Sequence, residues 1–182
     1  MAQRKILLNS AQIEVKIRDV IRYPLLSDYM QNGQSKPVVL IGVMTGAYPF
    51  MYNLGLALSV RHSVDFITVK SYEGKSRKES QVVSDISIDI EGKYVIIVDE
   101  YSDSGKTLEF LIKHLSKKNP FALKTCTLIY KESKTFTPNY FGVKLAKDDP
   151  RWFYGYGLDR SDGTERNTNC IYYDEEIKEG LV

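Results

Sequence analysis

A short stretch near the middle of the chain concentrates residues suited to binding a phosphorylated sugar. The apolar run at 95–98 leads directly into Asp99 and Glu100, and Asp103 follows, before a turn of small residues at 104–107. Hydroxyls and free backbone N–H groups at such a turn suit a phosphate when a helix begins there. Neighbouring carboxylates suit ribose hydroxyls or a hydrated Mg²⁺. The stretch therefore predicts an anion cradle with acids beside it.

The residues on either side of this stretch predict a strand followed by a helix. Four consecutive Val and Ile residues are typical of a strand that is buried on both faces. The apolar residues that follow recur at i, i+3, i+4 and i+7, as in an amphipathic helix; they are Leu108, Leu111, Ile112 and Leu115. The acids thus lie at the carboxyl end of a buried strand, where open α/β sheets place their ligands.

Two other interpretations of the turn are weaker. The turn contains the Gly-Lys-Thr end of a nucleotide-triphosphate loop, but that motif needs a glycine five residues before Gly105, where this chain has Glu100. A turn without function would not be expected to gather three acids within positions 99–103, directly after a buried strand.

Apolar patterns along the chain predict a mostly parallel α/β fold. An opening amphipathic helix around residues 13–21 should end or kink before Pro24. Strands are expected at 38–43, 66–69, 94–98 and 124–130, and helices at 49–58 and 106–118. This alternation favours a mostly parallel central sheet flanked by helices.

Residues 72–93 depart from this alternation. The segment 73–80 is polar and charged, and 82–90 alternates apolar and polar residues like an exposed antiparallel arm. We expect a mobile loop of the kind that excludes water from reactive sites.

Composition restricts the class of protein. A chain of 182 residues, 43% of them hydrophobic, is long enough for one domain with its own core. With 25 Lys and Arg against 23 Asp and Glu, bulk charge does not indicate a nucleic-acid partner. Apolar runs fall short of the ~20 residues of a membrane helix, so no membrane partner is expected. Two cysteines, Cys126 and Cys170, favour reduced thiols and a cytoplasmic protein.

The central stretch resembles the phosphoribosyltransferases, whose hallmark is an apolar strand, two acids and an Asp-[Ser/Thr]-Gly-x-Thr loop. Other segments narrow this resemblance to the hypoxanthine-guanine branch. Residues 38–50 resemble its first core strand and pyrophosphate loop, and 65–72 resemble the strand and Ser-Tyr pair that open its mobile loop. Residues 155–159, followed by 166–167, resemble its closing Gly-Tyr-x-Leu-Asp and Arg-Asn signature.

Two spacings support the same branch. Lys131 lies 32 residues after Asp99, and Trp152 a further 21 residues on. Both are similar to the spacings that lead from the acidic pair to the purine-contacting lysine and then to the stacking aromatic. The resemblance covers roughly residues 11–175, nearly the whole chain.

The resemblance implies a type I phosphoribosyltransferase fold in a single domain over residues 1–182. Its core would span about 36–145 and its mobile loop about 71–93, with a purine-binding hood formed by about 146–182 and the N-terminal segment. The implied activity is Mg²⁺-dependent transfer of the 5-phosphoribosyl group from phosphoribosyl pyrophosphate to N9 of hypoxanthine or guanine, a purine salvage reaction. A homodimer or homotetramer is also implied.

Roles for individual residues follow from the same resemblance. Asp103 would contact purine N7 as general acid/base, Lys131 would donate to the 6-oxo oxygen, and Trp152 would stack on the base. The residues implied to bind phosphoribosyl pyrophosphate are Thr45, Gly46, Ser71, Tyr72, Asp99, Glu100, Ser102, Asp103, Ser104, Gly105, Lys106, Thr107 and Arg166. Those implied to bind the purine are Lys131, Trp152, Phe153 and Asp159, and the implied metal ligands are Asp99, Glu100 and Asp159.

The chain departs from the family pattern at four places, one of which is that no Ser-Thr-Gly run follows the Ser-Tyr pair at 71–72. The acidic pair is Asp99-Glu100, where Glu-Asp is more common, which exchanges the reach of the two side chains. Thr45 stands where many members have Lys, so a cation facing pyrophosphate is missing there. Six residues separate Asp159 from Arg166, one more than the family pattern has.

Two alternative functions are also weighed. A regulator that keeps the phosphoribosyl pyrophosphate site as a sensor would be expected to carry an added DNA-binding domain or a basic face, and the sequence shows neither. A xanthine- or guanine-restricted transferase stays open, because the sequence does not rank the three bases.

Overall fold

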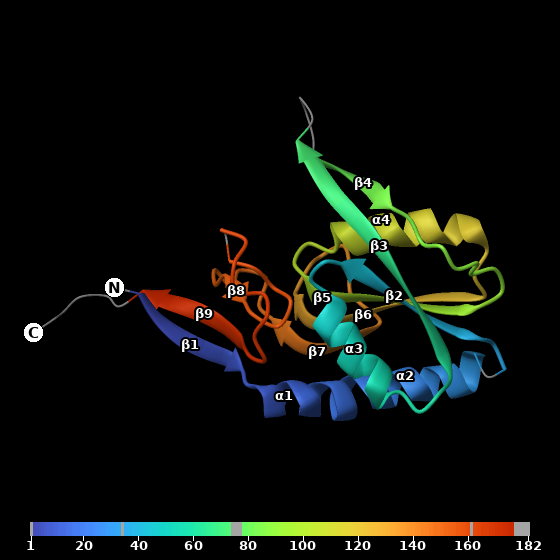
Figure 1. The fold of residues 1–182 in the computed structure, drawn as a ribbon, viewed down its shortest axis with the longest axis horizontal. Helices are drawn as coiled ribbons and strands as arrows, with labels where there is room; N and C mark the ends of the chain where they lie inside the picture. The colour runs from blue at the N-terminus through green and yellow to red at the C-terminus, as the bar shows by residue number, and fades with distance from the viewer. Residues whose placement is uncertain (1, 34, 74–77, 161, 177–182) are drawn as a thin grey trace, which may run out of the picture.

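A six-stranded sheet forms the centre of the computed structural model, which describes residues 2–33, 35–73, 78–160 and 162–176 (Figure 1). Its strands are β2 (Val38–Met44), β3 (His62–Glu73), β4 (Lys78–Ser84), β5 (Tyr94–Ser102), β6 (Ala122–Lys131) and β7 (Tyr140–Leu145). They lie in the order β4-β3-β2-β5-β6-β7, and β4 is antiparallel to its neighbour while the other pairs are parallel. The expected mostly parallel sheet is confirmed, and β7 is a further strand that was not expected from the sequence.

Helices cover both faces of this sheet (Figure 1). On one face, α4 (Lys106–Leu115) packs its Leu108, Leu111 and Leu115 against β2 and β5, and the short 3₁₀ segment η3 (Ser116–Lys118) follows it. On the other face lie α3 (Tyr48–Ala57) and the N-terminal helix. The side chains of residues 95–98 point alternately to the two faces of the sheet, and each face packs against helices. Both faces are therefore buried, which explains why this sequence is continuously apolar.

The N-terminal helix continues through Pro24, so it does not end there as expected, although its turns widen into a π-helix just before the proline. It comprises α1 (Ser10–Val15), the π-helical η1 (Lys16–Ile21), α2 (Arg22–Asp28) and the π-helical η2 (Tyr29–Gly33). Pro24 lies in the first turn of α2, directly after the wider turns of η1, where a missing N–H is tolerated. The helix therefore passes the proline and carries Asp28 against the sheet.

A second sheet joins the two ends of the described chain. It contains β1 (Ala2–Leu8), β9 (Ile171–Glu176) and β8 (Phe153–Tyr154), all antiparallel, in the order β1-β9-β8. The N-terminal strand was not expected from the sequence. The hood predicted at about 146–182 includes residues 161 and 177–182, which lie outside the described part.

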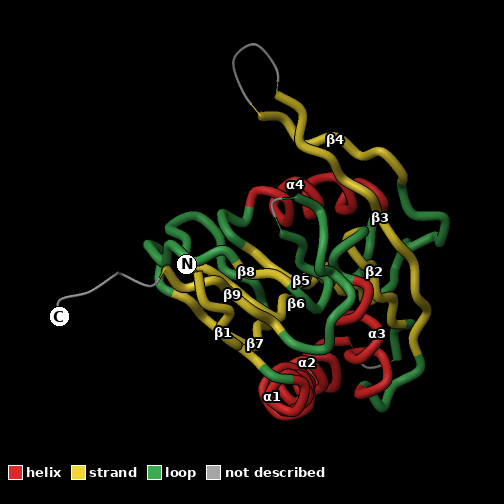
Figure 2. Tube along the Cα trace, turned by 60° about the vertical axis from the view of Figure 1, so that its left-hand side comes forward, coloured by secondary structure: helices red, strands yellow, loops and turns green. Residues whose placement is uncertain are grey.

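The hairpin of β3 and β4 extends away from the body past α4 (Figure 2). Its antiparallel pairing agrees with the sequence pattern, but the exposed arm expected at 82–90 is wrong in its second half. Ile86 and Ile90 are buried, and Asp65 accepts hydrogen bonds from the backbone N–H groups of Ser87 and Ile88 at 2.6 and 2.8 Å. The apolar positions therefore face the core beside α4. Residues 74–77 of the predicted mobile loop lie outside the described residues.

Within the described ranges, none of the helices is long and apolar enough to cross a membrane.

Candidate active site

Two adjacent carboxylates, Asp99 and Glu100, lie near the carboxyl end of β5. β5 extends beyond its apolar run, so that Asp99 pairs with Thr127 of β6 and lies 8% exposed. Burial raises the pKa of Asp99 to about 6. Burial and the neighbouring Asp99 charge raise the pKa of Glu100 well above its usual range. The two carboxylates therefore lack enough cationic partners in the described part of the chain to balance their burial.

Glu100 faces the loop that follows β2. A Cβ on Gly46 would lie 1.7 Å from Glu100 Oε1, so a larger residue at position 46 would have to displace this carboxylate. Glu100 Oε2 is buried and, among the described residues, has no hydrogen-bond partner. Such an oxygen suits Mg²⁺, which binds one or two carboxylates and keeps water or substrate phosphate as its other ligands. The described residues contain no cluster of three or more His, Cys, Asp or Glu side chains that could hold a metal ion by themselves.

The turn after β5 forms a small cradle at the start of α4. Gly105 is the N-cap residue of α4, with φ of +79°, and a Cβ there would lie 2.5 Å from Phe136. Glycine is therefore required both by the backbone conformation and by the packing. A cavity of about 140 Å³ opens here. Its lining contains Asp99, Tyr101, Ser102, Asp103, Ser104, Gly105, Lys106, Thr107 and Leu108. Backbone N–H groups at a helix start favour an anion in such a space.

Asp103 and Lys131 meet at the carboxyl ends of neighbouring strands. The register of β5 and β6 pairs Ser102 with Tyr130, and the next residue of each strand brings Lys131 Nζ to 3.4 Å from Asp103 Oδ1. The Asp103 side chain is 61% exposed and the Lys131 side chain 22%. An acid and a cation thus stand together beside the cradle, accessible to a ligand.

A second cavity, of about 590 Å³, lies beyond the loop that follows β2. Thr45 and Arg166 both line it, together with Tyr48, Gly163, Glu165, Asn167 and Thr168. Arg166 Nη2 lies 2.5 Å from Asp159 Oδ2, and Arg166 Nη1 donates to the Gly157 carbonyl at 2.6 Å. The structure therefore joins directly two residues that the sequence resemblance had assigned to separate ligands.

The predicted purine-binding aromatics occupy different environments. Trp152 is 64% exposed, and its indole N–H donates to the Asp159 carbonyl at 3.0 Å. Phe153 is buried, and its ring makes edge contacts with Tyr101 and Tyr173. The Phe153 side chain thus belongs to the core beneath the small sheet, which leaves its backbone as the part that can contact a ligand.

The predicted site residues of β5, β6 and the loop after β2 lie close together. The predicted site residues at the end of β3 are described only in part. Ser71 and Tyr72 lie in β3 opposite Ser80 and Glu79, and their side chains are outside the described part. The Tyr48 hydroxyl donates to Asn167 Oδ1 at 2.5 Å and joins the two sides of the larger cavity, a contact that was not predicted from the sequence. The position of Tyr48, directly after the loop, was the available signal.

Known proteins are similar to this chain over most of its length. A model of the phosphoribosyl transferase domain matches residues 7–161. The chain is 32% identical over 161 residues to the hypoxanthine-guanine phosphoribosyltransferase of Aquifex aeolicus, a match that covers 85% of this chain and 86% of the relative.

Solved structures give the same result. The hypoxanthine-guanine phosphoribosyltransferase of Bacillus anthracis is similar with a TM-score of 0.79 and 28% identity, covering 95% of this chain and 100% of the other. A variant of the hypoxanthine phosphoribosyltransferase of Trypanosoma cruzi, complexed with the product IMP, is similar with a TM-score of 0.82 and 30% identity, covering 94% and 91% of the two chains.

Proposed function

This chain belongs to the phosphoribosyltransferase family, and we propose that it transfers the 5-phosphoribosyl group of phosphoribosyl pyrophosphate to N9 of hypoxanthine or guanine. The products are IMP or GMP and pyrophosphate, as in purine salvage. The C1–oxygen bond to pyrophosphate breaks, the C1–N9 bond forms, and the proton on purine N7 leaves the base. The observation that carries the proposal is the meeting of Asp103 and Lys131 at 3.4 Å beside the cradle.

The cradle and the acids account for the phosphoribosyl half of the substrate. The turn from Ser102 to Thr107 would bind the 5′-phosphate through its N–H and hydroxyl groups. Asp99 and Glu100 would hold the ribose hydroxyls and a metal ion. When bound, Mg²⁺ supplies positive charge to the departing pyrophosphate. The unpartnered Glu100 Oε2 supports this assignment.

Asp103 and Lys131 account for the base. A carboxylate accepts, so Asp103 would take the N7 proton as the C1–N9 bond forms. An ammonium group only donates, so Lys131 would bond the 6-oxo oxygen. Trp152, and the backbone of Phe153 and Asp159, would complete the purine site.

The larger cavity is the place for pyrophosphate. Gly46 and Thr45 would offer backbone N–H groups, and Arg166 would pair with the anion as a cation. Asp159 would bind a second Mg²⁺, in exchange for its ion pair with Arg166. Ser71 and Tyr72, at the end of β3, would contact the same substrate when the β3–β4 hairpin covers the reacting atoms.

Initial rates and product analysis test the proposal. Purified protein with phosphoribosyl pyrophosphate and Mg²⁺ should form IMP from hypoxanthine and GMP from guanine, each with one equivalent of pyrophosphate. Xanthine is the third base, and faster use of xanthine, or use of guanine alone, would support a restricted transferase. Absence of turnover with all three bases, while phosphoribosyl pyrophosphate binds, would support the sensor function and contradict ours.

We also propose a cytoplasmic homodimer or homotetramer. Two free cysteines support the location. Exposed apolar side chains of α3 and β3, which include Tyr52, Leu56 and Phe66, support self-association. Leu56→Asp should shift the mass measured by light scattering towards the monomer, whereas Ile6→Asp, at another exposed apolar position, should not. An unchanged mass for Leu56→Asp would place the contact elsewhere.

A further inference from the structure

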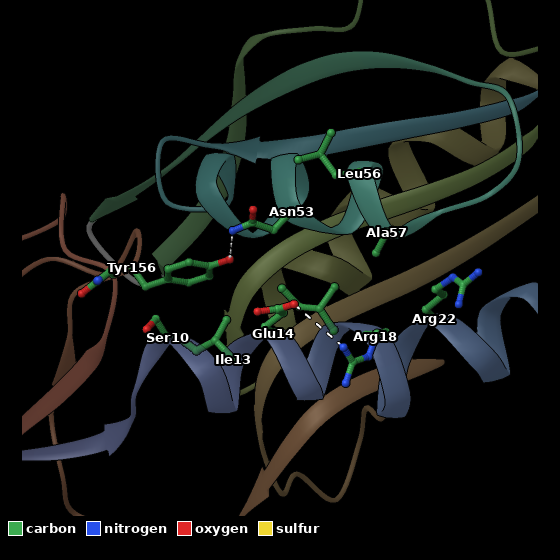
Figure 3. Close-up of a pocket in the computed structure, with 11 residues that line it drawn as sticks. Ser10, Ile13, Glu14, Arg18, Arg22, Asn53, Leu56, Ala57 and Tyr156 are labelled. Carbon is green, nitrogen blue, oxygen red and sulfur yellow. Dashed lines mark hydrogen bonds and ion pairs between the residues drawn. The ribbon is translucent and has the colours of Figure 1, made fainter.

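A hydrogen bond joins two parts of the site that lie 103 residues apart. Asn53 belongs to α3, the helix that follows the Thr45–Gly46 loop, and Tyr156 belongs to the turn that leads to Asp159. Asn53 Nδ2 donates to the Tyr156 hydroxyl at 2.6 Å (Figure 3). That hydroxyl donates to the Pro49 carbonyl at 3.3 Å. The phenol is thus held by the first turns of α3.

The surroundings of Tyr156 give this bond its importance. Tyr156 is 6% exposed but borders a cavity of about 520 Å³ between α3 and the N-terminal helix (Figure 3). The cavity walls include Ile13, Ile17 and Ala57. The ring belongs to the buried core, and the hydrogen bonds of its hydroxyl with Asn53 and with the Pro49 carbonyl are the directional contacts that fix it.

The position of Tyr156 is transmitted to the larger cavity through the next residue. A Cβ on Gly157 would lie 2.0 Å from the Gly46 carbonyl oxygen, so the two backbones are in direct contact. The Gly157 carbonyl accepts from Arg166 Nη1 at 2.6 Å, and its N–H donates to the Arg166 carbonyl at 2.9 Å. A displaced Tyr156 would therefore displace both Gly46 and Arg166.

We propose that Asn53 is a positioning residue that sets the distance between the Gly46 loop and Arg166 for pyrophosphate. This inference rests on the proposed function of those two groups. Gly157, next to Tyr156, contacts Gly46 and Arg166, so the effect of Asn53 should fall mainly on phosphoribosyl pyrophosphate and pyrophosphate. It acts through Tyr156 and touches no reacting atom.

Steady-state kinetics and calorimetry of the full-length protein test this role. Asn53→Leu removes the donor at similar size, and it should raise KM for phosphoribosyl pyrophosphate by about 3- to 10-fold, the value of one hydrogen bond. The Kd of pyrophosphate with Mg²⁺ should rise equally, with kcat and KM for hypoxanthine within twofold of wild type. Asn53→Asp returns an oxygen that can accept from the Tyr156 hydroxyl in place of the Pro49 carbonyl, and should restore most of the affinity.

Two further variants keep the test decisive. Tyr156→Phe retains the ring and should reproduce the Asn53→Leu effect, with no further loss in the double variant beyond that of Tyr156→Phe. Asn32→Ala removes a helical asparagine bonded to Asp28 at 2.6 Å, away from the site, and should change neither pyrophosphate Kd nor KM. Unchanged pyrophosphate affinity in folded Asn53→Leu or Tyr156→Phe, beside an active wild type, overturns the inference. An inactive wild type that still binds pyrophosphate contradicts the proposed function instead.

Discussion

The two ends of β5 use carboxylates in opposite ways. At its amino end, Asp28 Oδ2 accepts hydrogen bonds from Tyr94 at 2.7 Å and from Tyr140, and lies 2.7 Å from Lys124 Nζ. Burial alone would raise the pKa of Asp28, but these partners outweigh it and lower the pKa. At the carboxyl end, burial raises the pKa of Asp99 to about 6.

This difference separates a structural cluster from a binding site. The Asp28 cluster is complete within the protein, because one cation, Lys124, and two tyrosine hydroxyls surround the charge. The pair Asp99 and Glu100 lacks such partners in the described structure and leaves Glu100 Oε2 unpaired. Unsatisfied buried charge is expected where a ligand or metal completes the site. Substitutions at the carboxyl end of β5 should therefore lower activity, and substitutions in the Asp28 cluster at its amino end should lower stability.

The largest effect is expected at Asp103. Asp103→Asn removes the group that accepts the N7 proton and should lower kcat by ~10²- to 10⁴-fold, the span of a general acid/base. Because the side chain is largely exposed, the melting temperature should change little. Steady-state rates with hypoxanthine, together with thermal unfolding, measure both. Full turnover in the variant would contradict the assignment.

A smaller effect is expected at Lys131. Lys131→Ala should raise KM for hypoxanthine and guanine by ~10- to 100-fold, since a hydrogen bond from a charged donor is lost. KM for phosphoribosyl pyrophosphate should stay within about threefold of wild type, less than the loss of one such bond would give. An equal rise of both constants would place Lys131 outside the base site.

At the structural end of β5, Asp28→Asn should lower the free energy of unfolding by about 1.5–3 kcal/mol at pH 7, since charged hydrogen bonds are lost. The folded-state pKa of Asp28 is below its unfolded value, so its contribution is present above about pH 4 and disappears as pH falls below that. The acid dependence of stability should therefore be weaker in Asp28→Asn. Urea unfolding between pH 2 and 7 measures it, and a change in KM would argue against a purely structural role.

The smallest effect has the opposite sign. Asp99→Asn should stabilise the ligand-free protein by on the order of 1 kcal/mol, because it removes a buried charge without a partner. The pKa of Asp99 is raised, so wild-type stability from this group falls as pH rises from about 4 to 6, and the variant should lack this fall. The same variant should bind phosphoribosyl pyrophosphate more weakly. Destabilisation at pH 7 would show that Asp99 has a structural partner.

Local patterns predicted the carboxyl end of β5 well. The strand at 94–98, the helix that begins at Lys106 and the acids between them are encoded in one continuous segment, and all three are confirmed. The Asp28 cluster was not predicted, because Asp28, Tyr94 and Tyr140 meet only after the helix has passed Pro24. The pairing of β1 with β9 is likewise non-local, and so is the ion pair of Asp159 with Arg166.

The most direct test of the central claim compares two bases with the wild-type protein. Lys131 has only donors, so it can bond the 6-oxo group of hypoxanthine but opposes the 6-amino group of adenine with another donor. The account predicts that kcat/KM for hypoxanthine exceeds that for adenine by ~10⁴-fold or more, the discrimination of a site whose polar group is left unpaired. Comparable values for the two bases would contradict the placement of base recognition at the Asp103–Lys131 edge.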